Sequence, residues 1–371
     1  MRDSGSNSLK KTISSPIVLV TIVVIVFTVA VFAINYYQHK QHFESGVIPT
    51  TAKRTKILNQ EEIEVNHSKV LLKKPQGEVK FLSIFVNGTG SGNDDRISQL
   101  IIKLSNFLLS NGAIFIQSLR EDDPSLKITP QDRARNVIDI ANYFGSLPEY
   151  HNIPLIVLGH SEGALVAIIA CSELSSCKGI VCLSMPGLPG VEYASERAKL
   201  ELKRMGMSDQ VIDRYVRFLN QLYIISSSNA DDQLVLAKIS KLQIEFSESV
   251  NDKEFIQLLK VQQPLLISKW MRSFLRLDPA QYFSKLSCPV LLIYGKNDEF
   301  LDPELNSKTL LSAASQRPEG SINITILSSH DHFLMKGNYQ MENGNAIQEK
   351  HGRVEKTILD WLSTKLRKSD S

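Results

Sequence analysis

The chain has 371 residues, of which 43% are hydrophobic, so it can bury a full core in one large domain or in two. Its formal net charge of +3 provides no strongly basic surface, and we expect no nucleic-acid partner. The cysteines form no CxxC pair and match no zinc-site spacing, so we expect no bound metal.

The first predicted element is the uncharged apolar stretch from Pro16 to Ile34, near the ~20 residues that a membrane-spanning helix needs. Lys10 and Lys11 precede it and only Lys40 follows closely, which predicts a cytoplasmic N-terminus. We therefore expect a single-pass protein whose remaining residues lie on the non-cytoplasmic side. The predicted segments are a cytoplasmic N-terminus at 1–15, a transmembrane anchor at 16–37 and a polar tether at 38–57.

A cleaved signal peptide is the alternative interpretation of this stretch. Val31 and Ala33 have the small side chains that cleavage sites require. The apolar stretch is longer than the ~7–15 residues of a usual signal core, which favours an uncleaved anchor. Cleavage would instead give a secreted or periplasmic protein.

After the tether, apolar strand patterns alternate with helical patterns. Strands that are apolar throughout and alternate with helices predict a mostly parallel sheet covered on both faces. The strand patterns lie at 61–74, 79–88, 113–119, 153–160, 179–185, 289–295 and 322–329, and the helical patterns at 98–112, 130–147, 163–174 and 353–368.

One block does not follow this alternation. Residues 187–286 are mostly helical in pattern and stand between two core strands, so we predict an inserted helical cap. The sheet-containing core is then made of residues 58–186 and 287–371.

Cys171 and Cys177 lie close together in the sequence and could form a disulfide. Each position also suits a small buried hydrophobic side chain, which is how a free cysteine packs. We therefore expect plain packing rather than a bridge.

The stretch LIVLGHSEGALVAIIA at 155–170 places Ser161 between a strand and a helix, with Gly159 and Gly163 on either side. This is the pattern of a nucleophile elbow, a turn so tight that side chains at the two glycine positions would collide with backbone. Ser161 is therefore the predicted nucleophile. His160 is predicted to be structural, because its side chain should point away from the serine.

A serine nucleophile needs a base, and the base needs an acid that orients it. Asp298 follows the strand at 289–295 and is the predicted acid. Glu299 and Asp302 are expected to face solvent, with Asp302 placed to cap a helix. For the base, His330 and His332 both follow the last strand, and the pattern alone leaves both open.

An oxyanion needs two backbone N–H donors. Glu162, directly after the nucleophile, supplies one in this arrangement. The glycine loop after the strand at 79–88 should supply the other, and we predict Thr89, with Gly88 and Gly90 as close alternatives.

Several stretches resemble the α/β-hydrolase superfamily over about residues 57–367, most specifically bacterial serine hydrolases of the serine aminopeptidase-like or dienelactone-hydrolase-like type. The stretches are NGTGSGNDDR, GHSEG, SKWMRSFLRLDPAQYFSKLSCPVLLIYGKNDEF and ILSSHDHFL. In the last one, the family pattern of a small residue and Asn or Asp before the histidine implies His332 as the base. The sequence departs from the family at Ser91 and Gly92, where relatives often carry proline, and at Ala164, where they commonly carry glycine.

The resemblance implies an α/β-hydrolase fold and ester or amide hydrolysis without metal or organic cofactor. We expect a membrane-anchored serine hydrolase, most simply a carboxylesterase, acting on a small acyl ester or a peptide-like substrate. An aminopeptidase or acyltransferase with the same catalytic residues is an alternative. A non-catalytic binding protein on this fold is another alternative, but such a protein would be expected to have lost one or more of the serine, histidine and aspartate.

Overall fold

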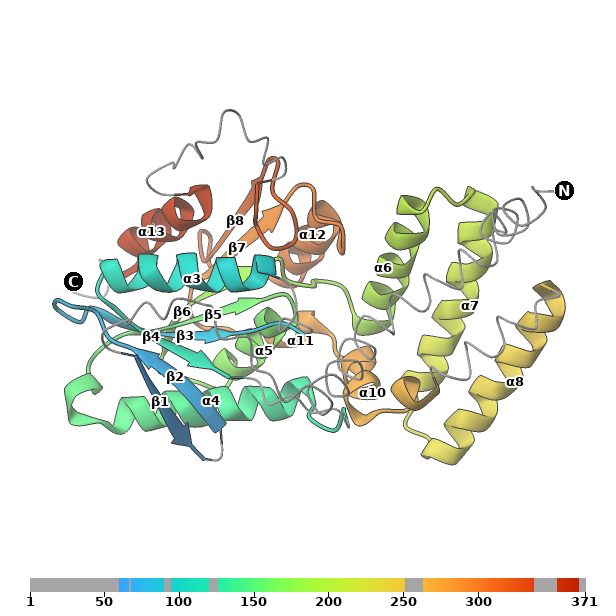
Figure 1. Cartoon of the computed structure of the whole chain (residues 1–371), viewed down its shortest axis with the longest axis horizontal. Helices are drawn as coiled ribbons and strands as arrows, with labels where there is room; N and C mark the ends of the chain where they lie inside the picture. The colour runs from blue at the N-terminus through green and yellow to red at the C-terminus, as the bar shows by residue number, and fades with distance from the viewer. Residues whose placement is uncertain are drawn as a thin grey trace, which may run out of the picture. The chain divides into compact units, whose positions relative to one another are not determined.

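The computed structural model describes residues 60–66, 68–89, 95–119, 126–250, 263–336 and 352–366. The predicted N-terminal segment, anchor and tether, with the alternative cleavage site, lie outside these residues. In the ranges just given, no helix is both long enough and apolar enough to cross a membrane. The chain divides into two compact units, which are described separately (Figure 1).

The larger unit contains an eight-stranded sheet with the order β1-β2-β4-β3-β5-β6-β7-β8. β1 and β2 are antiparallel to each other, and β2 is antiparallel to β4, whereas the strands from β4 to β8 are parallel. The predicted mostly parallel sheet is confirmed. The strands are β1 (Gln60–Val65), β2 (Ser68–Lys73), β3 (Phe81–Val86), β4 (Ala113–Ser118), β5 (Leu155–His160), β6 (Cys177–Leu183), β7 (Val290–Gly295) and β8 (Ile322–Leu327).

Helices cover the sheet because its central strands are apolar on both faces. Every residue of β3, β5 and β7 is buried. α3 (Asp95–Ser110) and α13 (Arg353–Leu366) share one hydrophobic cluster with the sheet, and α4 (Pro130–Ser146) lies on the opposite side from α3 (Figure 1). The remaining helical segments of this unit are η1 (Pro148–Tyr150), α5 (Glu162–Cys171), α11 (Pro279–Phe283) and α12 (Pro303–Ala313).

α5 is buried along its whole length, and a disulfide fixes its end. Cys171 closes α5, Cys177 opens β6, and the two form a disulfide with a Cα–Cα separation of 5.7 Å. The expectation of plain packing was therefore wrong. The short connection from α5 to β6 brings the two Cα atoms into the 4.4–6.8 Å range that a disulfide needs. Cys182 and Cys288 stay as buried thiols, and burial raises the pKa of Cys288 to about 11.

Replacing Cys171 and Cys177 together by alanine should lower the free energy of unfolding by about 2 kcal/mol, because a bridge over so short a loop removes little entropy from the unfolded chain. Denaturant titration would measure this loss. Reductant should destabilise the wild-type protein and leave the double variant unaffected. A wild-type protein that shows four reactive thiols when denatured without reductant would contradict the bridge.

The second unit is helical, and its described residues are 126–129, 189–250 and 263–277. Its helices are α6 (Gly190–Arg204), α7 (Asp209–Ser227), α8 (Asp232–Val250) and α10 (Lys269–Arg276). Leu126 belongs to its hydrophobic cluster, and the Leu126 carbonyl accepts a hydrogen bond from the Trp270 N–H at 2.9 Å. The sequence did not predict that the segment at 126–129 belongs to this unit.

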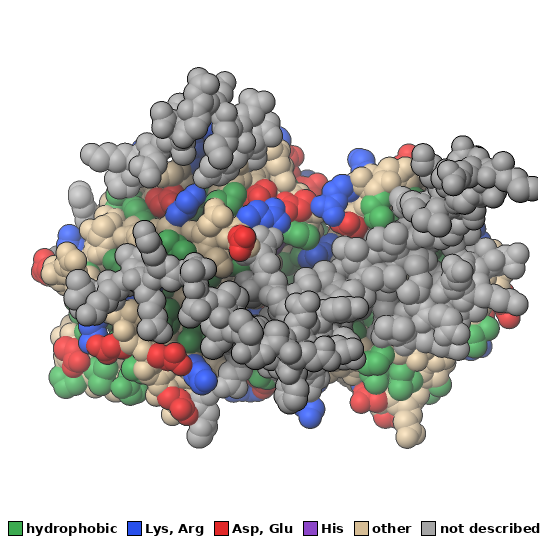
Figure 2. Space-filling model, in the orientation of Figure 1, with side chains coloured by type: hydrophobic (Ala, Val, Ile, Leu, Met, Phe, Trp, Pro, Cys, Tyr) green, Lys and Arg blue, Asp and Glu red, His purple; other side chains and the backbone are tan. Residues whose placement is uncertain are grey.

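The described surface carries charges of both signs. On the face drawn in Figure 2, Lys and Arg side chains are interspersed with Asp and Glu side chains. This mixture agrees with the small net charge of +3.

Candidate active site

The structure places Ser161 in a strained turn between β5 and α5. Its backbone angles are φ 54° and ψ −125°, a conformation that costs free energy for a residue with a side chain. The turn is compact: a Cβ at Gly159 would overlap the backbone of Gly163, and a Cβ at Gly163 would lie 2.6 Å from the Asn87 carbonyl oxygen. Because these obstacles are backbone atoms, the strained serine depends on glycine at both flanking positions.

Gly163→Ala should therefore lower the free energy of unfolding by more than about 3 kcal/mol, since the new methyl group meets main chain that cannot move aside. Denaturant titration would measure the change. Gly145→Ala in α4 is the matched control, because a Cβ there meets nothing within 4 Å and should stabilise the helix by about 0.5–1 kcal/mol. An equal effect of the two substitutions would contradict the tight elbow.

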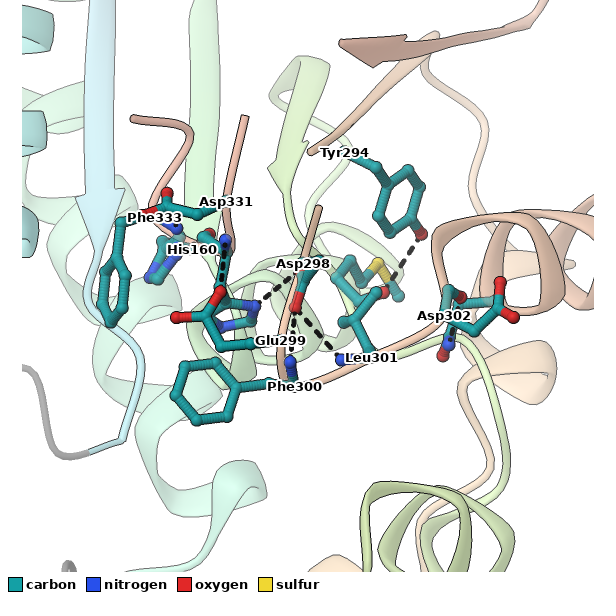
Figure 3. A network of polar contacts seen from close by, with 12 residues as sticks. His160, Tyr294, Asp298, Glu299, Phe300, Leu301, Asp302, Asp331 and Phe333 are labelled. Atoms are coloured by element: carbon teal, nitrogen blue, oxygen red, sulfur yellow. Dashed lines mark hydrogen bonds and ion pairs between the residues drawn. The ribbon is translucent and has the colours of Figure 1, made fainter. Parts of the chain in front are cut away.

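Asp298 and His332 are brought together at the C-terminal edge of the sheet. They follow β7 and β8, which are neighbours, and parallel neighbouring strands end at the same edge. His332 Nδ1–H donates to Asp298 Oδ2 at 2.7 Å, and the side chains are 5% and 0% exposed. Asp298 Oδ1 accepts from the N–H groups of Phe300 at 2.8 Å and Leu301 at 3.0 Å (Figure 3). The carboxylate is therefore held in one orientation against the imidazole.

The second nitrogen of His332, Nε2, has no hydrogen-bond partner in the described part of the chain. Ser161 Oγ has none there either, and the Ser161 side chain is only partly buried. His160 joins the two loops that carry these residues: its Nε2–H donates to the His332 carbonyl at 3.0 Å, and the two rings lie 5.0 Å apart. His160 thus holds the loop of His332 against the elbow.

His330 occupies a different position. Its Nδ1 contacts the Ser328 carbonyl at 2.8 Å, and the described residues give it no carboxylate partner. The structure therefore distinguishes the two histidines that the strand pattern left open, because His332 alone of the two meets Asp298.

Three charged residues that the sequence analysis did not place in the site support these loops. Arg96, at the start of α3, pairs with Glu299 at 2.9 Å and with Asp331 at 3.0 Å, and its guanidinium lies 4.1 Å from the Phe333 ring centroid. Glu299 Oε2 also accepts from the His332 N–H at 3.3 Å. The network therefore joins the loop after β7 to the loop after β8.

The expectation that Glu299 faces solvent was wrong, because this side chain is only 18% exposed and is ion-paired. Asp302 does cap a helix: its Oδ1 accepts from the N–H groups of Glu304 and Leu305 at the start of α12.

Tyr294, in β7, is fully buried. Its hydroxyl donates to the Met185 carbonyl at 3.0 Å (Figure 3). Burial, and then the nearby Cys182 and Asp298, raises the pKa of Tyr294 well above its ordinary value. The phenol therefore stays protonated and adds no second negative charge beside the carboxylate.

The glycine loop lies against the elbow. A Cβ at Gly88 would lie 3.0 Å from Ser161 Cβ, so the backbone just before Thr89 lies against Ser161. Neither the N–H nor the hydroxyl of Thr89 has a partner among the described residues, and its hydroxyl oxygen is buried. Glu162 is the first residue of α5, where helix N–H groups lack intrahelical acceptors. Gly90 lies outside the described residues.

In the ranges that the structure describes, no group of three or more His, Cys, Asp and Glu side chains is placed to hold a metal ion. The candidate residues Ser161, His332 and Asp298 offer a hydroxyl, an imidazole and a carboxylate. These groups can do nucleophilic and acid–base chemistry without a metal.

No protein-family model matches this sequence, and neither does any curated protein. Solved structures do match. The esterase Pf2001 of Pyrococcus furiosus is 13% identical, with 86% of this chain and 96% of that chain covered and a TM-score of 0.51. Est1E of Butyrivibrio proteoclasticus, with ferulic acid bound, is 14% identical, with 83% and 99% covered and a TM-score of 0.51. At these identities the likeness is one of fold.

Proposed function

We propose that this chain, which has the α/β-hydrolase fold, is a serine hydrolase that cleaves carboxylic esters through Ser161, His332 and Asp298. The observation that carries the proposal is the 2.7 Å hydrogen bond from His332 to the buried Asp298, beside a serine held at φ 54°. Such a serine is a poor nucleophile until a base takes its proton, and the oriented imidazole is that base.

In the proposed reaction, Ser161 Oγ attacks the acyl carbon while His332 Nε2 takes the hydroxyl proton. The carbonyl oxygen becomes an oxyanion, to which the N–H groups of Glu162 and Thr89 donate. His332 then gives its proton to the leaving alcohol as the acyl–oxygen bond breaks. Water, deprotonated by the same imidazole, releases the acid and restores Ser161. Asp298 stabilises the imidazolium at each step.

Ester substrates are favoured over peptides because a small acyl ester needs little substrate-specific binding machinery. An aminopeptidase needs a carboxylate to bind the free amine of its substrate, and α6 supplies the acidic candidates Glu192, Glu196 and Glu201. Glu196 already pairs with Lys199 and Glu201 with Arg204, each within the helix. The two solved structures with the same fold are esterases, which also supports ester hydrolysis.

A fluorophosphonate probe tests the proposal, because it reacts with activated serines. The full chain should be labelled, and peptide mass spectrometry should place the label on Ser161. A panel of p-nitrophenyl esters and aminoacyl p-nitroanilides should then show turnover of the esters first. Folded protein that is neither labelled nor active on any ester would exclude the proposed function.

We also propose that residues 16–37 anchor the chain in a membrane, with the site on the non-cytoplasmic side. The support is the uncharged stretch from Pro16 to Ile34 and its preceding lysines. The full chain should stay with membranes after alkaline extraction and be digested by protease added from the non-cytoplasmic side. A mature N-terminus just after Ala33 would show a cleaved signal instead.

A further inference from the structure

A buried ion pair lies directly behind the elbow. Arg133, in the first turns of α4, pairs with Glu162 at 3.3 Å, and the two side chains are 11% and 5% exposed. Charges buried to this degree cost free energy unless they are paired, so the pair needs both members. Glu162 is also the residue whose backbone N–H would meet the oxyanion.

The same guanidinium reaches the other side of the oxyanion site. Arg133 Nη2 donates to the carbonyl oxygen of Asn87, which follows β3 and comes two residues before Thr89. The Asn87 C=O and the Gly88 N–H belong to one planar peptide group and are fixed relative to each other. A hydrogen bond that holds the Asn87 carbonyl therefore sets the orientation of this peptide plane, from which the loop continues to Thr89. Arg133 thus fixes both backbone segments that would supply oxyanion donors.

The two segments touch each other directly, both where a Cβ at Gly88 would lie 3.0 Å from Ser161 Cβ and where the Asn87 carbonyl oxygen would lie 2.6 Å from a Cβ at Gly163. Because Gly163 has no side chain, packing at this second point cannot prevent the backbone of the loop from rotating. The guanidinium of Arg133 can do so, because it donates to the Asn87 carbonyl oxygen in a fixed direction while its charge lies beside the Glu162 carboxylate.

We propose that Arg133 is a positioning residue for the oxyanion site, holding Glu162 and Asn87 so that the N–H groups of Glu162 and Thr89 converge. This inference rests on the proposed hydrolase function. The competing explanation is that Arg133 only stabilises the fold. The two explanations predict different activities for a double variant.

The decisive comparison is Arg133→Met with the double variant Arg133→Met, Glu162→Leu. Arg133→Met removes the guanidinium from beside a buried carboxylate and should lower both Tm and kcat. The double variant replaces the whole pair by apolar side chains, which proteins often tolerate, so its Tm should return close to the wild-type value. Its kcat on an ester should stay about 10- to 100-fold low, because donors misplaced by a fraction of an ångström lose transition-state stabilisation.

KM should change by less than about threefold in the double variant, because the oxyanion contact forms only as the transition state is approached. Arg135→Met is the matched control: Arg135 lies on the same helix, is 68% exposed and pairs with Asp132. Its Tm and kcat should stay at the wild-type values. A double variant that recovers kcat together with Tm would overturn the positioning role.

Arg133→Lys gives an independent test should the double variant fail to fold. Lysine keeps the charge beside Glu162 but lacks the fork, so we expect a folded protein with kcat about 10-fold low. Wild-type kcat in this variant would overturn the proposal. Failure of the underlying function would look different, because the wild-type chain itself would then show neither fluorophosphonate labelling nor ester turnover.

Discussion

Ser161→Ala should lower kcat/KM for ester hydrolysis by roughly 10⁴- to 10⁶-fold, because in the proposed mechanism the substitution removes the atom that forms the acyl-enzyme. The fold should persist, since Ser161 Oγ makes no hydrogen bond to any described residue. The measurement is steady-state turnover of a p-nitrophenyl ester, with the Tm of the variant followed by circular dichroism. Residual turnover would reflect the oxyanion donors and binding alone.

Ser184→Ala is the control for this substitution. Ser184 also has a left-handed backbone, with φ 48°, and follows β6, the strand beside the elbow strand. It is fully buried and its hydroxyl oxygen has no hydrogen-bond partner among the described residues, so removing that oxygen should leave turnover close to the wild-type value. If Ser161→Ala kept its activity while Ser184→Ala lost it, the nucleophile would not be Ser161.

Local patterns predicted the sheet and the position of Ser161 because both depend on short-range chemistry. Strands buried on both faces must be apolar throughout, and an elbow needs small residues two positions before and after the serine. Asp298 could be placed because a carboxylate that follows a parallel strand lies at the carboxyl edge of the sheet. These inferences needed no knowledge of which residues meet across the fold.

The supporting contacts could not be predicted, because each joins residues far apart in the chain. Arg96 meets Glu299 across 203 positions and Asp331 across 235, so Glu299 looked like any carboxylate in a solvated loop. Arg133 reaches Asn87 across 46 positions, and its place in α4 follows the same helical pattern as its neighbours. The prediction for the two cysteines failed for a different reason: a free buried cysteine and a disulfide-bonded one give the same apolar sequence pattern.

His332→Ala should lower kcat/KM by about 10³- to 10⁶-fold, the second of the largest effects expected here, because Ser161 then has no base. The geometry favours this histidine: its Nδ1–H donates to Asp298 Oδ2 at 2.7 Å, so Nε2 is the nitrogen that would exchange the proton with Ser161 in the proposed mechanism. Fluorophosphonate labelling should slow by a comparable factor, since that reaction also needs an activated hydroxyl. Ester turnover and labelling rate would be measured on the same protein.

His330→Ala is the matched control, since His330 lies two residues away on the same loop and is similarly buried, at 7% exposure against 4% for His332. Its Nδ1 contact with the Ser328 carbonyl is structural, so its loss should cost about 1 kcal/mol of stability and change kcat/KM only a few-fold. If burial alone decided the effect on kcat/KM, the two substitutions would have equal effects. Contact with the Asp298 carboxylate is what distinguishes the two histidines. A severe His330→Ala defect beside a mild His332→Ala defect would show that His330, and not His332, is the base.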